Sequence, residues 1–138
     1  MIIEICATSI ESILNAENAG AHRLELCQNY SIGGVTPSEQ FLHEAIKVSS
    51  LPINVLIRPK GGDFIFNDKE YDLMINKINL FKVYNVKGFV IGFMEKDRSL
   101  NSDILLKLVS AGTIVNFVFK FEKFLKIFFL HPKSKTTT

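Results

Sequence analysis

The chain has 138 residues, of which 47% are hydrophobic and 22% are charged, and its formal net charge is +2. This size and composition predict one globular domain with its own core. The small net charge argues against a nucleic-acid partner, because the 16 basic residues are spread along the chain. The sequence has no apolar run long enough for a membrane-spanning helix. Two cysteines and no signal-peptide pattern lead us to expect a reducing, cytoplasmic compartment.

Strand and helix patterns alternate from the start of the chain. We predict strands at residues 2–6, 23–27, 53–57 and 88–91 and helices at about 8–20, from 36, at about 67–84 and at 102–111, with a fifth strand-like run at 114–119. The first helix is predicted to begin at Thr8, since Glu11 follows at the capping-box spacing. The second is predicted to open at Thr36, which precedes a proline at the first helical position.

This alternation predicts an α/β protein with a parallel sheet built from βα units. Either an open doubly wound sheet or part of a (β/α)8 TIM barrel fits the pattern, and both collect functional groups at the carboxyl ends of their strands. The carboxylates of Glu4 and Glu25, placed inside strands, favour the barrel. We therefore expect a partial barrel of about four βα units over residues 1–112. Residues 113–138 form a divergent tail, rich in phenylalanine and lysine.

One three-residue motif occurs twice, as Glu4-Ile5-Cys6 and as Glu25-Leu26-Cys27. Side chains two positions apart on a strand point the same way, so each carboxylate shares a face with its thiol. If the two strands are parallel neighbours in register, both pairs meet in one small site. Thiolates suit a soft ion such as Cu(I), so Cys6 and Cys27 are candidate metal ligands. The alternative is that both cysteines act as small apolar core residues.

The polar residues around this motif allow two interpretations. Glu4 and Glu25 are candidate acid/base groups, or they form structural ion pairs with Arg58 and Arg23. Arg58 and Asp63 flank a glycine-rich loop and are candidate ligand-binding residues for a carboxylate or a phosphate. In the alternative interpretation this loop is a tight turn in which Asp63 accepts hydrogen bonds from its own amides.

Four segments together resemble the copper homeostasis protein CutC family. They are IEIC at residues 3–6, AGAHRLELC at 19–27, GGVTPS at 33–38 and IRPKGGDF at 57–64. The resemblance covers about residues 1–112 and implies a TIM-barrel fold, a cytoplasmic location and a role in copper handling. Members of the family are nearly twice as long, and their Thr-Phe-His-Arg-Ala-Phe-Asp type motif is absent at residues 116–121.

This departure leads us to expect a truncated or frame-shifted half barrel, and it leaves three functions open. The first is a copper-homeostasis protein that binds Cu(I) through the two thiolates. The second is a small-molecule enzyme, or the relic of one, that uses Glu4 and Glu25 and holds an anionic substrate on Arg58. The third is a fragment without a function of its own, which associates with other copies through the exposed edges of the half barrel.

Overall fold

The computed structural model describes residues 1–112, 116–121 and 124–130, with side chains over residues 1–112. One sheet runs through it in the order β1-β2-β3-β4-β5-β6. The strands are β1 (Glu4–Ala7), β2 (Arg23–Leu26), β3 (Ile53–Ile57), β4 (Gly88–Ile91), β5 (Asn116–Phe121) and β6 (Phe124–Leu130). The first five strands pair in parallel, and β6 pairs antiparallel with β5. This parallel arrangement confirms the predicted partial α/β barrel.

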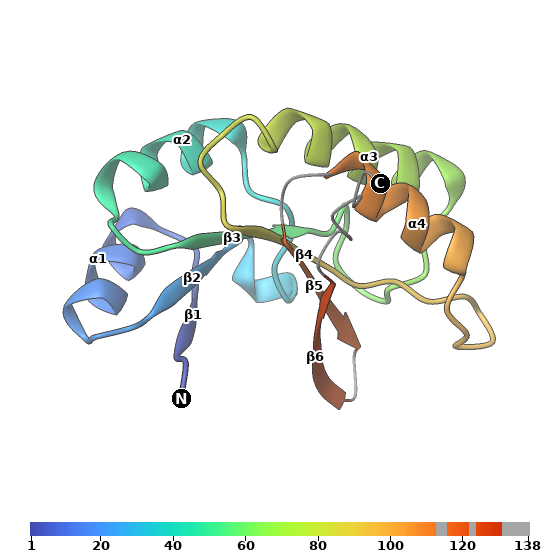
Figure 1. Ribbon diagram of the computed structural model, residues 1–138, viewed down its shortest axis with the longest axis horizontal. Helices are drawn as coiled ribbons and strands as arrows, with labels where there is room; N and C mark the ends of the chain where they lie inside the picture. Colours follow the sequence, from blue (N-terminus) through green and yellow to red (C-terminus); the bar gives the residue numbers. More distant parts are fainter. Residues whose placement is uncertain (113–115, 122–123, 131–138) are drawn as a thin grey trace, which may run out of the picture.

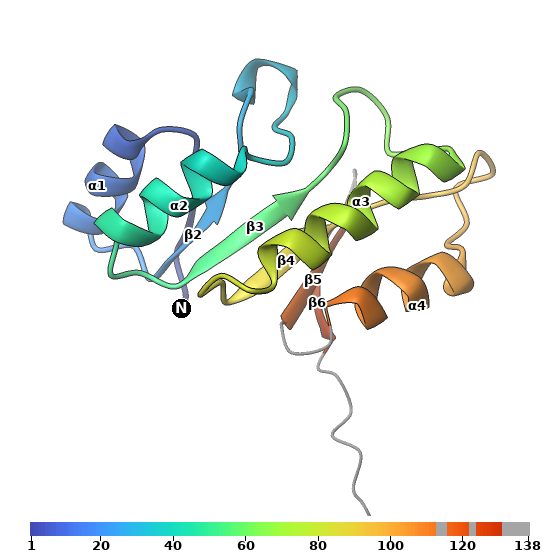
Figure 2. The same ribbon diagram turned by 90° about the horizontal axis from the view of Figure 1, so that it is seen from above.

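Helices connect the parallel strands and follow an arc over one side of the curved sheet (Figure 1). They are α1 (Ile10–Asn18), α2 (Glu39–Val48), α3 (Asp68–Phe81) and α4 (Ser102–Ala111), with a short 3-10 helix, η1 (Tyr30–Ile32), after β2. Seen from above, α1 lies beside α2 and α3 beside α4, and β3 is visible between the two pairs of helices (Figure 2). The open side of the arc is therefore the inner face of a half barrel.

Two helices begin at residues other than the predicted ones. The cap of α1 is Ser9, which forms a capping box with Ser12 in place of Thr8 with Glu11. The cap of α2 is Ser38, because the Thr36 hydroxyl is used elsewhere. It accepts a hydrogen bond from the Arg58 backbone N–H at 2.8 Å and donates one to the Arg58 carbonyl at 3.1 Å. These bonds fasten the entrance of α2 to the end of β3.

The main core fills the space between the sheet and the helices. Side chains that alternate along β2, β3 and β4 meet the apolar faces of the four helices there. The fully buried members with the largest side chains are Ile13, Leu24, Leu26, Leu42, Ile57, Met74, Ile78, Phe81, Phe89, Ile91 and Phe93. The intervening strand residues point to the opposite, inner face, where Cys27, Leu56 and Val90 form a separate small cluster.

The last part of the chain extends the sheet. The fifth strand-like run was predicted and corresponds to β5, whereas β6 was not predicted, because its segment has neither clean alternation nor a helical stripe. Residues 113–115, 122–123 and 131–138 of the predicted tail lie outside the described residues. The division of the chain at residue 112 therefore stays a prediction.

Candidate functional site

The inner face of the sheet carries a polar row of residues paired across four strands. The register aligns Cys6 with Glu25, Glu25 with Asn54, and Asn54 with Gly88. We call these four residues the lower row. Glu25 and Asn54 are 3% and 4% exposed, although polar side chains are costly to bury without partners. Buried polar side chains on the inner face of the sheet are typical of a barrel interior that holds polar groups, and not of an apolar core.

A second row lies one pleat closer to the carboxyl ends of the strands. This upper row contains Cys27, Leu56 and Val90, which pack together on the inner face. Cys27 is buried, whereas Cys6 in the lower row is exposed. The two thiols therefore lie on the same face of neighbouring parallel strands but at different positions along the strand direction.

The prediction that the first two strands are parallel neighbours is correct, but the assumed register is wrong by two residues. Glu4 is aligned with Arg23, and Cys6 is aligned with Glu25 instead of Cys27. Strands of a closing barrel are staggered, and each strand keeps its inner face only when the shift is an even number of residues. The stagger separates the two motif copies along the sheet without turning either one away from the interior.

A cavity of about 160 Å³ opens at the carboxyl ends of β1 to β4. It brings together four of the predicted site residues, namely Cys6, Glu25, Cys27 and Arg58. Its remaining lining residues are Tyr30, Gly33, Leu56, Phe64, Val90, Ile91 and Gly92. The cavity thus combines two thiols, one carboxyl group and one guanidinium group with apolar walls.

Two predicted site residues lie outside this cavity. Glu4 Oε2 accepts hydrogen bonds from Arg23 Nε at 2.6 Å and from Asn54 Nδ2 at 2.9 Å. Its ion pair with Arg23 is the structural alternative that the sequence left open for this carboxylate. Asp63 accepts a hydrogen bond from the N–H of Ile65 at 3.3 Å. It therefore bonds within its own loop, as the tight-turn interpretation expects.

Arg58 is buried at the top of the cavity and is held by loop carbonyl groups. Nη1 donates to the carbonyl of Gly34 at 2.9 Å and to that of Ile32 at 3.3 Å, and Nη2 donates to that of Gly62 at 2.6 Å. The guanidinium carbon also lies 4.4 Å from the centre of the Phe64 ring. Gly33 makes room for this arrangement, since a Cβ at that position would lie 2.9 Å from Nη1.

An ion pair between Arg58 and the strand carboxylates, one of the two interpretations open from the sequence, is not among the salt bridges of the described residues. Within residues 1–112, the salt bridges join Arg23 to Glu4 and Lys60 to Glu70. Arg58 follows the end of β3, and its side chain turns to the loops above the sheet instead of reaching down to the lower row. Its Nε is a buried atom without a hydrogen-bond partner.

Metal binding in this cavity would depend on the two thiols. In the part of the chain that the structure describes, no three His, Cys, Asp or Glu side chains lie close enough together to hold a metal ion. His22 is used elsewhere, because its Nδ1 accepts a hydrogen bond from the N–H of Ile3 at 2.9 Å. A low-coordinate ion that accepts two sulfur ligands fits this donor set better than one that needs four.

Sequence analysis did not single out Asn54 as a site residue. A signal was present, because Asn54 is the one polar residue in the otherwise apolar strand β3. Its amide bonds to Glu4 and so links β3 to β1 across β2. The contacts of Phe64 and Gly33 with Arg58 had no comparable signal, because they depend on how two loops meet.

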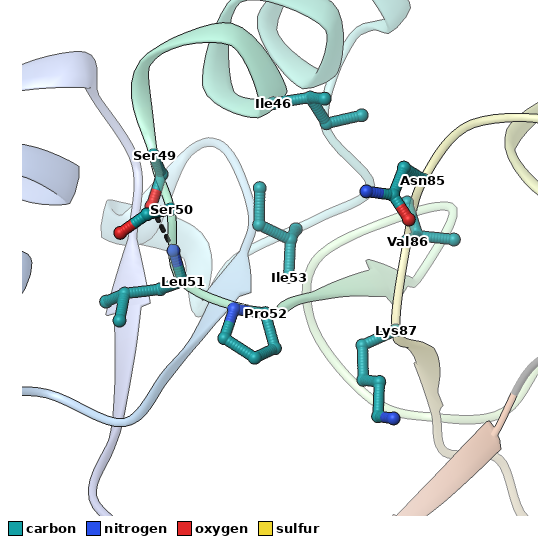
Figure 3. Close-up of a pocket in the computed structure, with 9 residues that line it drawn as sticks. All are labelled: Ile46, Ser49, Ser50, Leu51, Pro52, Ile53, Asn85, Val86 and Lys87. Atoms are coloured by element: carbon teal, nitrogen blue, oxygen red, sulfur yellow. Dashed lines mark hydrogen bonds between the residues drawn. The ribbon is translucent and has the colours of Figure 1, made fainter.

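A larger cavity of about 310 Å³ lies at the opposite end of the sheet. Figure 3 shows Ser49, Ser50 and Leu51 on one side of it and Asn85 and Lys87 on the other. It contains none of the predicted site residues and lies at the amino ends of β3 and β4. In barrels of this type that end usually serves stability rather than chemistry.

None of the described helices is both long and apolar enough to pass through a membrane.

Comparison with known proteins gives consistent matches over most of the chain. A family model described as "CutC family" matches residues 1–124. A CutC family protein of Pasteurella multocida is 41% identical over 112 residues, which are 81% of this chain and 46% of that protein. The human copper homeostasis protein cutC homolog is 38% identical over 109 residues, which are 79% of this chain and 40% of that protein.

The fold also matches a solved structure. The crystal structure of the putative copper homeostasis protein CutC from Streptococcus agalactiae superimposes with a TM-score of 0.79 at 28% sequence identity. The match covers 86% of this chain and 59% of that one. This chain therefore spans less than half the length of the two curated relatives named above and somewhat more than half of the solved structure.

Proposed function

This chain belongs to the CutC family, and from that premise we propose that it takes part in copper homeostasis by binding Cu(I) between the thiolates of Cys6 and Cys27. The proposal is supported by the names of the human and mouse relatives, which are called copper homeostasis protein homologs. The single observation that carries it is that the chain's only two cysteines line one cavity. We further propose a cytoplasmic location, because Cu(I) ligation needs both cysteines as thiolates and a reducing compartment keeps them in that form.

The chemistry of the cavity is consistent with a soft, monovalent ion. Cu(I) prefers thiolate ligands and accepts a low coordination number, so two sulfur atoms are sufficient. Cys6 is exposed on the edge strand β1 and offers a first contact, whereas Cys27 is buried and would complete the site. Leu56 and Val90, which pack against Cys27, give that second ligand an apolar surrounding that limits access of water.

Copper titration of the reduced protein tests this proposal. Cu(I) is titrated against a competing chelator with the wild type, Cys6→Ser, Cys27→Ser and the double variant. We expect a similar loss of at least tenfold in affinity in each single variant, because each one leaves a single thiolate. Glu4→Gln is the control, since it removes a carboxylate that lies outside the cavity. Equal affinity in the wild type and the double variant would refute the proposal.

A small-molecule enzyme is the second candidate, and it is favoured by the position of Glu25. This carboxyl group is buried in the same cavity as Arg58, which suits an acid or base acting on an anionic substrate. Glu4 is a weaker candidate for the partner role, because it is held by Arg23 and Asn54. Turnover of a panel of small carboxylate and phosphate esters would test this enzyme proposal. Copper-independent turnover should disappear in Glu25→Gln and persist in Glu4→Gln.

A further inference from the structure

We propose that the cavity at the carboxyl ends of β1 to β4 binds a small anion, with a carboxylate or phosphate group held by the guanidinium of Arg58. This inference is independent of copper, because it concerns the top of the cavity rather than the two thiols. It rests on the charge balance of Arg58, on its unused hydrogen-bond donors, and on the size of the space beside it.

The buried guanidinium group of Arg58 has no counter-ion among the described residues. Arg58 is only 5% exposed, and no carboxylate of the described residues lies within ion-pair distance of it. Its three polar contacts are neutral carbonyl groups, which offset a full positive charge only in part. A buried cation without a counter-ion is unfavourable, and a bound anion removes that penalty.

The guanidinium group of Arg58 also has N–H donors that make no hydrogen bond. A guanidinium group carries five N–H donors, and the three hydrogen bonds of Arg58 use at most three of them. At least two donors remain, and the Nε–H is one of them. Carboxylate and phosphate oxygens are the acceptors that arginine binds most strongly, often through two parallel bonds.

The side chain of Arg58 is also held in place before any ligand arrives. Carbonyl groups from two loops fix its two terminal nitrogens, Phe64 stacks on its plane, and Thr36 bonds its backbone on both sides. A binding group that is already ordered loses little conformational entropy when the ligand binds. Arg58 therefore has the preorganisation expected of a recognition residue.

The dimensions of the cavity limit the class of ligand. Its volume of about 160 Å³ equals the space of roughly five water molecules in the liquid. This volume suits a carboxylate of a few carbon atoms or a phosphate group, and it is too small for a nucleotide. Arg58 lies four residues beyond Asn54, whose neighbour in the register is Glu25. The Cα atoms of Arg58 and Glu25 are thus about 13 Å apart along the strand direction.

The position of Arg58 at the upper end of the cavity sets the orientation of the ligand. The anionic group lies next to the guanidinium group, and the other end of the ligand points toward the lower row. Leu56 and Val90 line the space between Arg58 and the lower row with apolar atoms. The favoured ligand is therefore a small organic anion with a single charged group, or inorganic phosphate bound at the upper end.

Nuclear magnetic resonance of the copper-free protein tests this inference directly. The chain contains three arginines, Arg23, Arg58 and Arg98, so the spectrum should show three Nε–H signals. We expect the Arg58 signal, assigned by its loss in Arg58→Lys, to shift and saturate with sodium acetate, with sodium phosphate or with both. The two titrations separate a carboxylate site from a phosphate site. The Arg98 signal serves as the internal reference for ionic strength.

Two variants complete the design. Arg58→Lys keeps a positive charge but loses the planar fork, so the affinity measured on backbone amide signals should fall about tenfold or more. Lys60→Ala removes a half-exposed cation from the same loop and should leave the affinity unchanged. The inference is overturned if the Arg58 signal does not move with either anion, or if the Arg58 and Arg98 signals drift alike without saturation. Because no copper is present, failure here leaves the thiolate proposal unaffected.

Discussion

Replacement of Gly33 by alanine tests whether the loop after β2 is shaped around Arg58. Gly33 has φ +87°, and a Cβ there would lie 2.9 Å from Arg58 Nη1. The variant therefore suffers two separate penalties. The left-handed backbone conformation costs a non-glycine residue about 1–2 kcal/mol. Displacement of the guanidinium group weakens its hydrogen bonds to loop carbonyls, and a bond to a charged group contributes about 1.5–3 kcal/mol.

Gly20→Ala is the matched control for the first penalty alone. Gly20 has φ +83°, and a Cβ there would meet nothing within 4 Å. Both variants should be destabilised by the left-handed backbone conformation, and only Gly33→Ala should also lose the contacts of Arg58. The expected difference in the free energy of unfolding between the two variants is thus about 1.5–3 kcal/mol.

Urea unfolding followed by circular dichroism measures this difference. For a domain of this size the slope of the free energy against urea is about 2 kcal/mol/M, so the two midpoints should differ by about 1 M. Equal midpoints for Gly33→Ala and Gly20→Ala would refute the reasoning, because they would show that Arg58 moves aside without cost. Gly33→Ala should also weaken binding of acetate or phosphate, whereas Gly20→Ala should not.

Two further predictions concern pH and association. Burial and the nearby carboxylate of Glu95 raise the pKa of Tyr71 to about 12. The unfolded chain, in which the pKa of a tyrosine is about 10, loses this proton first, so the free energy of unfolding should fall between about pH 10 and pH 12. The urea midpoint of Tyr71→Phe should fall less over this pH range than that of the wild type. An equal fall in both proteins would contradict the raised pKa of Tyr71. Ile3 and Ile5, 40% and 37% exposed, lie at the edge of the sheet formed by β1. Sedimentation velocity should show concentration-dependent association that Ile5→Lys reduces, and equal association in both proteins would argue against this edge as the contact.

The order of the elements could be predicted because it depends on local patterns. Strand β4 is apolar on both faces, β3 is apolar except for Asn54, and the helices between strands show apolar residues at helical spacing. The starts of α1 and α2 were predicted less well, since several residues near each start can cap a helix. Ser38 rather than Thr36 caps α2, because the Thr36 hydroxyl is hydrogen-bonded to the end of β3, a segment some twenty residues away.

The strand residues that share the inner face could be predicted from the sequence, whereas the geometry of the candidate site could be predicted only in part. Alternation along the strands was enough to place Cys6, Glu25 and Cys27 on one face, because a strand has a period of two. The same reasoning expected Arg58 beside the strand carboxylates. Its side chain instead bonds to carbonyl groups of two loops, whose meeting point no local pattern encodes.

The sequence by itself determined which residues face the interior and in what order the βα units follow one another, because hydrophobic period and helix caps act within a few residues. Only the tertiary structure decided how the neighbouring strands are staggered. The shift of two residues between β1 and β2 places Cys6 beside Glu25 and leaves Cys27 one row higher. That shift is a property of how a curved sheet pairs its backbone hydrogen bonds, and any even shift preserves the same alternation of faces.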